Sequence, residues 1–155
     1  MTHGASIKEF KPAWWLPGGH SQTLWRRLSP PAGISQHRQR IELRDGDFID
    51  IDWSADTGHK EVASETIVFI LHGLCGCSGS PYVIALQSVL AKNRISSVAM
   101  NFRGCSGETN RLARAYHSGV SEDLDEVFSR LIALHPQRNF VFVGYSLGAN
   151  VLLKW

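Results

Sequence analysis

A serine flanked by two glycines follows a short apolar run near the last residues of this sequence. The run Phe140–Val143 leads into Gly144-Tyr145-Ser146-Leu147-Gly148, after which a helical pattern begins. The G-x-S-x-G spacing at a strand-to-helix junction predicts a nucleophile elbow, which presents a serine hydroxyl at the tip of a sharp turn. Gly144 and Gly148 are small enough to let the strand and the helix approach each other. We expect Ser146 to attack an acyl carbon and form a covalent acyl-enzyme that water then cleaves.

Two backbone N–H groups are candidates to bind the negative oxygen that such an attack creates. Leu147 places its N–H at a helix N-terminus, where negative charge is favoured. Leu74 lies in the glycine-rich loop His72-Gly73-Leu74, which follows the apolar run Thr66–Leu71. The alternative for this loop is an ordinary strand-to-helix turn in which Gly73 takes no part in chemistry. His72 precedes Ser146 and lies at the root of the loop, so we interpret it as a shaping residue rather than a general base.

The usual partners of the serine are missing from the sequence. A serine hydrolase of this design carries its acid and its histidine after the nucleophile, in the order Ser, Asp/Glu, His. Residues 149–155 contain neither, so no acid and no histidine are assigned, and we expect the chain alone to be inactive. Three alternatives stay open: a serine that only forms a turn, a non-catalytic fragment or pseudo-enzyme, and a thioesterase-type acyl hydrolase.

The loop sequences favour a metal site or a nucleotide site less than they favour ordinary packing and turn formation. Cys75, Cys77 and Cys105 lie near His72 in the expected fold and could in principle bind zinc, but C-x-C is tighter than the usual ligand spacing. Packing explains small cysteines in crowded loops better. The glycines of the loop spell neither G-x-G-x-x-G nor a sequence with G-K-[ST]. We therefore expect no metal and no cofactor.

Composition narrows the class of protein further. The 155 residues are 43% hydrophobic and 19% charged with a net charge of +2, which is ordinary for a globular domain and too weakly basic to indicate nucleic acid. The arginines of the stretch 38–40 are expected on the solvated surface. The sequence shows no signal peptide and no apolar stretch long enough for a membrane span. Three cysteines that need no bridge suit a reducing cytoplasm.

The remaining pattern predicts an α/β fold with a mostly parallel sheet. Residues 1–34 indicate an irregular N-terminal arm and residues 35–155 a partial α/β domain. Two alternating runs, 40–43 and 48–53, are joined at Asp45-Gly46, a strong β-hairpin signal. Strands over 66–71, 97–102 and 140–143 then alternate with helices, which is a parallel βαβαβα pattern. Ser80 and Ser121 are expected to cap the first two helices.

Several segments together resemble the YheT-like family of α/β hydrolases, which are relatives of ABHD-type esterases and lipases. The segments are Pro17-Gly-Gly-His20-Ser-Gln22-Thr23-Leu24, Asp45-Gly-Asp47, His72-Gly-Leu-x-Gly76, Ser80-Pro81-Tyr82, Asn101-Phe-Arg-Gly-Cys-Ser-Gly107, Ala115-Tyr-His-Ser-Gly119 with Glu122-Asp-Leu124, and the serine motif itself. The resemblance spans nearly the whole chain.

The resemblance implies the N-terminal half of the α/β-hydrolase fold, truncated after the nucleophile elbow, from a cofactor-free serine esterase. Small-molecule esters with short- or medium-chain acyl groups are the implied substrates. Ser146 is then the nucleophile, with Leu74 and Leu147 as the oxyanion donors. The resemblance assigns His117 to bracing its loop and Asp123 to capping a helix.

The last strand has a folding consequence. In the family's sheet this strand pairs on both sides, whereas residues 140–143 would here have one partner only. An apolar strand with an unpaired edge favours association with another chain. We therefore expect self-association through this edge.

Overall fold

The computed structural model describes residues 11–28, 33–55 and 65–155, which fall into two compact units, Met1–Pro30 and Pro31–Trp155. The first unit contains helix α1 (Gly19–Leu28), whose Ser21 hydroxyl donates to the Gly18 carbonyl over 2.9 Å. The rings of Trp15 and Trp25 meet edge to face, 4.8 Å apart. This helix corrects the expectation of an irregular arm. Its ten residues make fewer than three turns, too few for an apolar period to stand out in the sequence.

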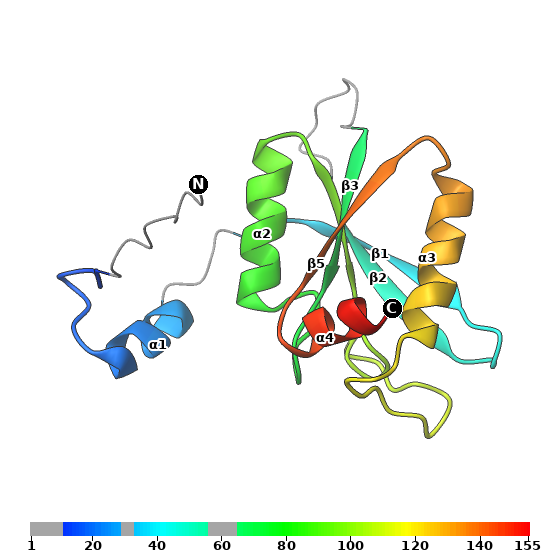
Figure 1. Cartoon of the computed structure of the whole chain (residues 1–155), viewed down its shortest axis with the longest axis horizontal. Helices are drawn as coiled ribbons and strands as arrows, with labels where there is room; N and C mark the ends of the chain where they lie inside the picture. The colour runs from blue at the N-terminus through cyan, green and yellow to red at the C-terminus, as the bar shows by residue number, and fades with distance from the viewer. Residues whose placement is uncertain (1–10, 29–32, 56–64) are drawn as a thin grey trace, which may run out of the picture. The chain divides into compact units, whose positions relative to one another are not determined.

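The second unit is built on a sheet whose described strands run in the order β1-β2-β4-β3-β5 (Figure 1). Strands β1 and β2 pair antiparallel, as do β2 and β4, whereas β3 lies parallel to both β4 and β5. The strand bounds are β1 Gln36–Glu42, β2 Phe48–Ser54, β3 Thr66–Leu71, β4 Ser96–Met100 and β5 Asn139–Gly144. The predicted hairpin and the predicted parallel strands are therefore confirmed.

The hairpin turn forms where Asp45-Gly46 predicts it. Gly46 has a φ of +86°, which a residue with a side chain rarely adopts, and its N–H donates to the Leu43 carbonyl over 3.0 Å. The Leu43 N–H in turn donates to the Asp47 carbonyl over 2.8 Å. The turn thus fixes the register that faces Arg40 to Asp50 and Arg38 to Asp52.

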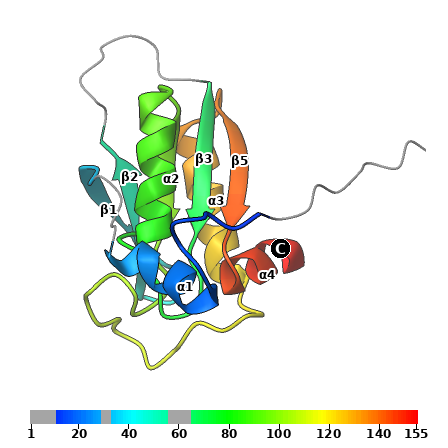
Figure 2. The same ribbon diagram turned by 90° about the vertical axis from the view of Figure 1, so that its left-hand side faces the viewer.

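Helices cover both faces of the sheet. Helix α2 (Pro81–Lys92) lies on one face and α3 (Glu122–Leu134) on the other, while α4 (Leu147–Lys154) follows β5 (Figures 1 and 2). Side chains of β3 alternate between the two layers: Phe69 and Leu71 belong to the larger core with α3, and Val68 and Ile70 to the smaller one with α2. The strand is buried on both faces, as its continuous apolar run predicts.

The two helices begin where predicted, but the expected capping bonds are wrong. Ser80 makes no side-chain bond to α2, because its Oγ accepts the Cys77 N–H over 2.9 Å and so holds the preceding loop. Ser121 precedes α3 with helical dihedral angles, φ −113° and ψ −12°, and likewise makes no side-chain cap. A serine before a helix is a local signal, whereas the partner of its hydroxyl depends on the neighbouring loop.

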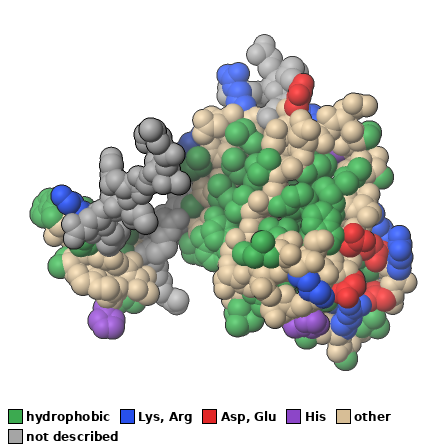
Figure 3. All heavy atoms as spheres, in the orientation of Figure 1, with side chains coloured by type: hydrophobic (Ala, Val, Ile, Leu, Met, Phe, Trp, Pro, Cys, Tyr) green, Lys and Arg blue, Asp and Glu red, His purple; other side chains and the backbone are tan. Residues whose placement is uncertain are grey.

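Strand β5 forms one edge of the described sheet, since β3 is its partner on one side and no described strand pairs with the other. Hydrophobic side chains gather on this side of the molecule, between α2 and α3 (Figure 3). Val141 in β5 is 50% exposed and Leu153 in α4 is 87% exposed. No described helix combines the length and apolar character that a membrane crossing requires.

Candidate active site

Ser146 occupies a strained backbone position between β5 and α4. Its φ of 51° and ψ of −112° are unusual for a residue with a side chain, and its side chain is exposed. The turn is fixed from both sides: the Tyr145 N–H donates to the Leu71 carbonyl over 3.0 Å, and the Gly148 N–H donates to the Tyr145 carbonyl over 2.9 Å. The turn lifts the hydroxyl clear of the strand.

The two glycines of the motif are required by close contacts. A Cβ on Gly144 would lie 2.5 Å from both the Cα and the backbone nitrogen of Ala149. A Cβ on Gly148 would lie 2.6 Å from the His72 carbonyl oxygen and 2.7 Å from that of Leu71. Real Cβ atoms do not approach backbone this closely, because the van der Waals optimum lies near about 3.5–4.0 Å. The spacing of the motif thus has the steric cause that the sequence suggests.

The loop after β3 passes next to Ser146. A Cβ on Gly73 would lie 3.4 Å from Ser146 Cβ, so the two backbones are in near contact. Leu74, the next residue, is 67% exposed. Among the described residues, neither the Leu74 N–H nor the Leu147 N–H has a hydrogen-bond acceptor within the protein. Two uncommitted donors therefore belong to the two segments that meet at the serine.

His72 holds the root of this loop and is fully engaged. Its Nε2 accepts the Phe102 N–H over 3.2 Å, so its Nδ1 carries the proton and donates to the Gly73 carbonyl, 2.7 Å away. Burial lowers the pKa of His72, which favours this neutral ring. With both ring nitrogens bound to backbone, His72 joins the end of β3 to the end of β4. This geometry supports a shaping residue rather than a general base.

The loop that follows β4 is held by a buried arginine. Arg103 donates from Nε to Asp123 over 2.7 Å, from Nη1 to Asp47 over 2.8 Å, and from Nη2 to Asp45 over 2.8 Å. Asp123 was expected to cap a helix, and its bond to Arg103 corrects that expectation. His117 does brace its own loop, since its Nδ1 accepts the Gly119 N–H over 3.1 Å. Sequence analysis did not identify Arg103, whose partners are distant in the chain.

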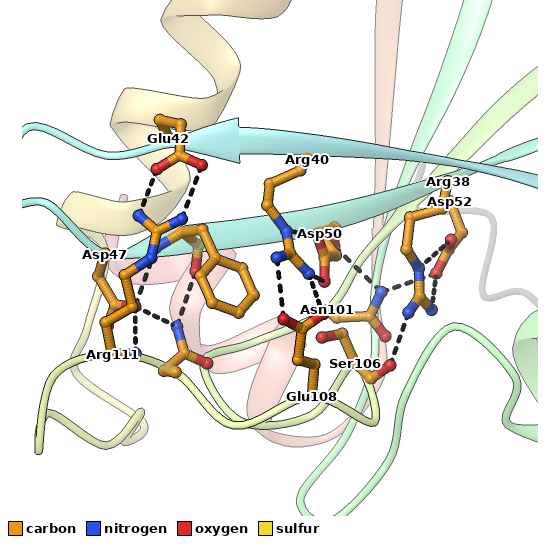
Figure 4. Close-up of polar contacts among 12 residues, drawn as sticks. Arg38, Arg40, Glu42, Asp47, Asp50, Asp52, Asn101, Ser106, Glu108 and Arg111 are labelled. Atoms are coloured by element: carbon orange, nitrogen blue, oxygen red, sulfur yellow. Dashed lines mark hydrogen bonds and ion pairs between the residues drawn. The ribbon is translucent and has the colours of Figure 1, made fainter.

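Two further arginines extend this polar layer across the hairpin (Figure 4). Arg38 pairs with its cross-strand partner Asp52, and Arg40 with Asp50, each over 2.8 Å from Nε to a carboxylate oxygen. Both aspartates are buried. Arg38 and Arg40 are themselves exposed, as expected of surface arginines, but each also supplies the cation that a buried aspartate needs.

The three cysteines are candidate zinc ligands in the sequence, where packing is the favoured explanation. Cys75, Cys77 and Cys105 are free thiols, and no group of three His, Cys, Asp or Glu side chains among the described residues is arranged to hold a metal ion. No described histidine is hydrogen-bonded to Ser146 Oγ. The structure therefore brings Ser146 next to Gly73, whose neighbour is Leu74, and Leu147 follows the serine directly; no described histidine lies within hydrogen-bond distance of the serine hydroxyl.

Comparison with known proteins identifies relatives of this chain. A family model described as the alpha/beta hydrolase fold matches residues 66–155. The "Putative esterase YheT" of Escherichia coli K12 is 39% identical over 149 residues, covering 96% of this chain and 43% of that protein. Human "Phospholipase ABHD3" is 28% identical over 152 residues, covering 94% of this chain and 37% of that protein. The chain spans about two fifths of the length of these relatives.

A solved structure shows the same fold. XC6422 from Xanthomonas campestris, described as an a/b serine hydrolase without lid, superposes with a TM-score of 0.59 at 20% sequence identity. The match covers 81% of this chain and 57% of that one.

Proposed function

The chain belongs to the α/β-hydrolase fold family as a YheT-like member, and from this premise we propose that it supplies the nucleophile and the oxyanion site of a serine esterase. The proposed substrates are carboxylic esters with short- or medium-chain acyl groups. The observation that supports this most is the strained backbone of Ser146, at φ 51° and ψ −112°. Backbone strain of this kind persists where the surroundings enforce it, and it clusters at active sites.

In the proposed reaction the Ser146 hydroxyl attacks the ester carbonyl carbon, and a general base takes its proton. The carbonyl oxygen becomes an oxyanion that accepts hydrogen bonds from the Leu74 and Leu147 N–H groups. The carbon–oxygen bond to the alcohol then breaks, and the alcohol leaves with a proton. Water attacks the resulting Ser146 ester, releases the carboxylic acid and returns the proton to Ser146.

No described residue is positioned as a general base for Ser146. In serine hydrolases of this fold the histidine follows the nucleophile in the chain, and residues 147–155 contain no histidine. Loss of the histidine from a serine protease lowers turnover on the order of 10⁶-fold. We therefore propose that this polypeptide alone turns over esters very slowly, while Ser146 remains a positioned nucleophile.

A fluorophosphonate with imidazole added as an external base tests this proposal. The Ser146 oxygen would attack phosphorus, fluoride would leave, and imidazole would take the proton, giving a stable adduct found by peptide mass spectrometry. We expect a Ser146 adduct that forms slowly without imidazole and faster with it. Ser146→Ala should abolish the adduct, and Ser129→Ala, which removes an exposed serine of α3, should leave it unchanged.

Two results would contradict the proposal. One is folded protein in which Ser146 stays unmodified even with imidazole, the outcome expected of a non-catalytic fragment. The other is equal modification of the Ser146→Ala variant, which would locate the reactive group elsewhere. Offering matched ester and thioester acyl donors under the same conditions then separates esterase from thioesterase preference, with faster acylation by the ester expected.

A further inference from the structure

The N–H groups of the two residues that flank Leu74 both donate to tyrosine hydroxyls. The Gly73 N–H donates to the Tyr82 hydroxyl over 3.0 Å, and the Cys75 N–H donates to the Tyr116 hydroxyl over 2.9 Å. The Gly76 N–H donates to the Gly73 carbonyl over 3.0 Å. In this described loop the amides of residues 73, 75 and 76 are thus committed, and that of Leu74 is left without an acceptor.

Tyr82 reaches Gly73 from the first turn of α2. Its ring contacts that of Tyr145, the neighbour of Ser146, with centroids 4.5 Å apart. Gly76 leaves the space that the hydroxyl occupies, because a Cβ on Gly76 would lie 2.5 Å from it. The hydroxyl of Tyr82 is therefore seated between the loop and the turn that carries the serine.

Tyr116 reaches Cys75 from the long loop after β4. Its ring stacks on Phe102 with centroids 5.1 Å apart and an interplanar angle of 7°. Phe102 is also bound to His72 through its N–H. Next to Phe102, Arg103 fastens the same loop to Asp45, Asp47 and Asp123. A buried ionic cluster thereby fixes the segment from which Tyr116 extends.

The backbone between the two tyrosines is itself unusual. Cys75 has a φ of 55°, so it turns the chain sharply without a glycine. A residue with a side chain keeps this conformation only where its surroundings hold it. The bond from its N–H to Tyr116 is one such restraint, and Tyr82 binds the Gly73 N–H on the other side of Leu74.

We propose that Tyr82 and Tyr116 are positioning residues that orient the Leu74 N–H toward the oxygen of a substrate acylating Ser146. This inference rests on the proposed function, which assigns the Leu74 N–H as an oxyanion donor. It adds the two residues that hold this donor in position. An oxyanion donor acts because it is already oriented when charge develops, so disorder in Leu74 would weaken it even with every atom present. Neither hydroxyl is itself assigned a contact with substrate.

Amide relaxation by NMR in Tyr82→Phe, Tyr116→Phe and the double variant tests the inference. Each change removes one oxygen and keeps the ring. In the unchanged chain we expect the Leu74 N–H to be ordered, with an order parameter of about 0.85, and in the double variant to fall below about 0.6. Ser97→Ala is the matched control, since it deletes a hydroxyl bonded to Ser54 Oγ over 3.1 Å at the opposite end of β4. It should leave Leu74 unchanged.

Gly76→Ala gives a second route to the same bond, because its Cβ would lie 2.5 Å from the Tyr82 hydroxyl while Tyr82 itself is kept. The same Cβ would meet the Gly73 carbonyl oxygen and Ser80 Oγ at 3.1 Å, so this variant is read together with Tyr82→Phe and not alone. It should lower the order parameter of the Leu74 N–H as Tyr82→Phe does. A Leu74 amide that keeps its order in the double variant would overturn the inference, as would an equal loss of order throughout the sheet, which would mean that the tyrosines act on the fold. No substrate enters this measurement, so failure of Ser146 to form an adduct would refute the proposed function separately.

Discussion

Gly148→Ala is expected to destabilise the fold, although helix propensity alone predicts the opposite. Gly148 lies in α4, and replacing a helical glycine with alanine ordinarily stabilises by about 1 kcal/mol. The structure opposes this gain. The new Cβ would meet the His72 oxygen at 2.6 Å, the Leu71 oxygen at 2.7 Å and Leu71 Cβ at 2.8 Å. The sign of the change therefore tests the close approach of strand and helix.

The size of the effect follows from the atoms involved. Two of the three contacts are backbone oxygens of β3 and its loop, which cannot rotate away as a flexible side chain could. Overpacking a rigid site costs about 1–3 kcal/mol. Taking the upper end, because all three contacts are far inside about 3.5 Å, and subtracting the propensity gain leaves a net loss of about 2 kcal/mol.

Urea unfolding followed by circular dichroism measures this loss. With a slope of about 2 kcal/mol per molar urea, the midpoint should fall by about 1 M. Gly79→Ala is the matched control, since its Cβ would meet only Cys77 Sγ, at an ordinary 3.5 Å. That variant should be neutral or up to about 1 kcal/mol more stable. A Gly148→Ala protein as stable as the unchanged chain would refute the steric argument.

Other perturbations test the polar layer and the sheet edge. Arg103→Leu leaves three carboxylates without their shared cation and should lower the free energy of unfolding by about 3–5 kcal/mol. Arg130→Ala breaks an exposed ion pair in α3 and should lower it by less than about 0.5 kcal/mol. Equal losses in the two variants would contradict the burial of the Arg103 cluster. Burial opposes ionisation of Asp47, but hydrogen bonds and Arg103 outweigh it and lower the pKa to about 2, below its ordinary 3.8. A lowered folded-state pKa stabilises above the unfolded value, so about 2 kcal/mol should be lost as the pH falls from 5 to 2, and Asp47→Asn should remove that part of the acid slope in urea titrations. Light scattering should detect concentration-dependent association of the unchanged chain and less of it in Val141→Lys, which places a charge on the β5 edge; a strict monomer at every concentration would argue against edge pairing.

Patterns among residues close in the sequence predict most of the fold. The Asp45-Gly46 hairpin, the apolar run of β3 and the G-x-S-x-G turn each depend on residues close in sequence, and the structure contains the hairpin, the strand and the strand-to-helix turn where those residues predict them. The ten-residue helix α1 was missed for the opposite reason, because it is short and set among proline and glycine. The capping serines mark the helix starts correctly, although their hydroxyls bond elsewhere or make no cap.

The residues that support the site depend on contacts across the chain. Arg103 meets Asp47, which lies 56 positions earlier, and Tyr116 meets Cys75, 41 positions earlier. No spacing rule connects such pairs, since they meet only after the hairpin, the β3 loop and the β4 loop have come together. The alternating pattern of β2 does carry one usable signal. Asp50 and Asp52 lie on the same face of the strand, and a buried carboxylate requires a cation, so arginine partners could have been predicted for both.

The arrangement of Ser146 with its two donors can be tested directly on a covalent adduct. In the structure of the chain phosphonylated at Ser146, the phosphoryl oxygen stands in for the oxyanion of an acylation intermediate. We predict that this oxygen accepts hydrogen bonds from both the Leu74 and the Leu147 N–H, at about 2.7–3.1 Å from each nitrogen. A phosphoryl oxygen that points into solvent, away from both nitrogens in a folded adduct, would contradict the proposed active site.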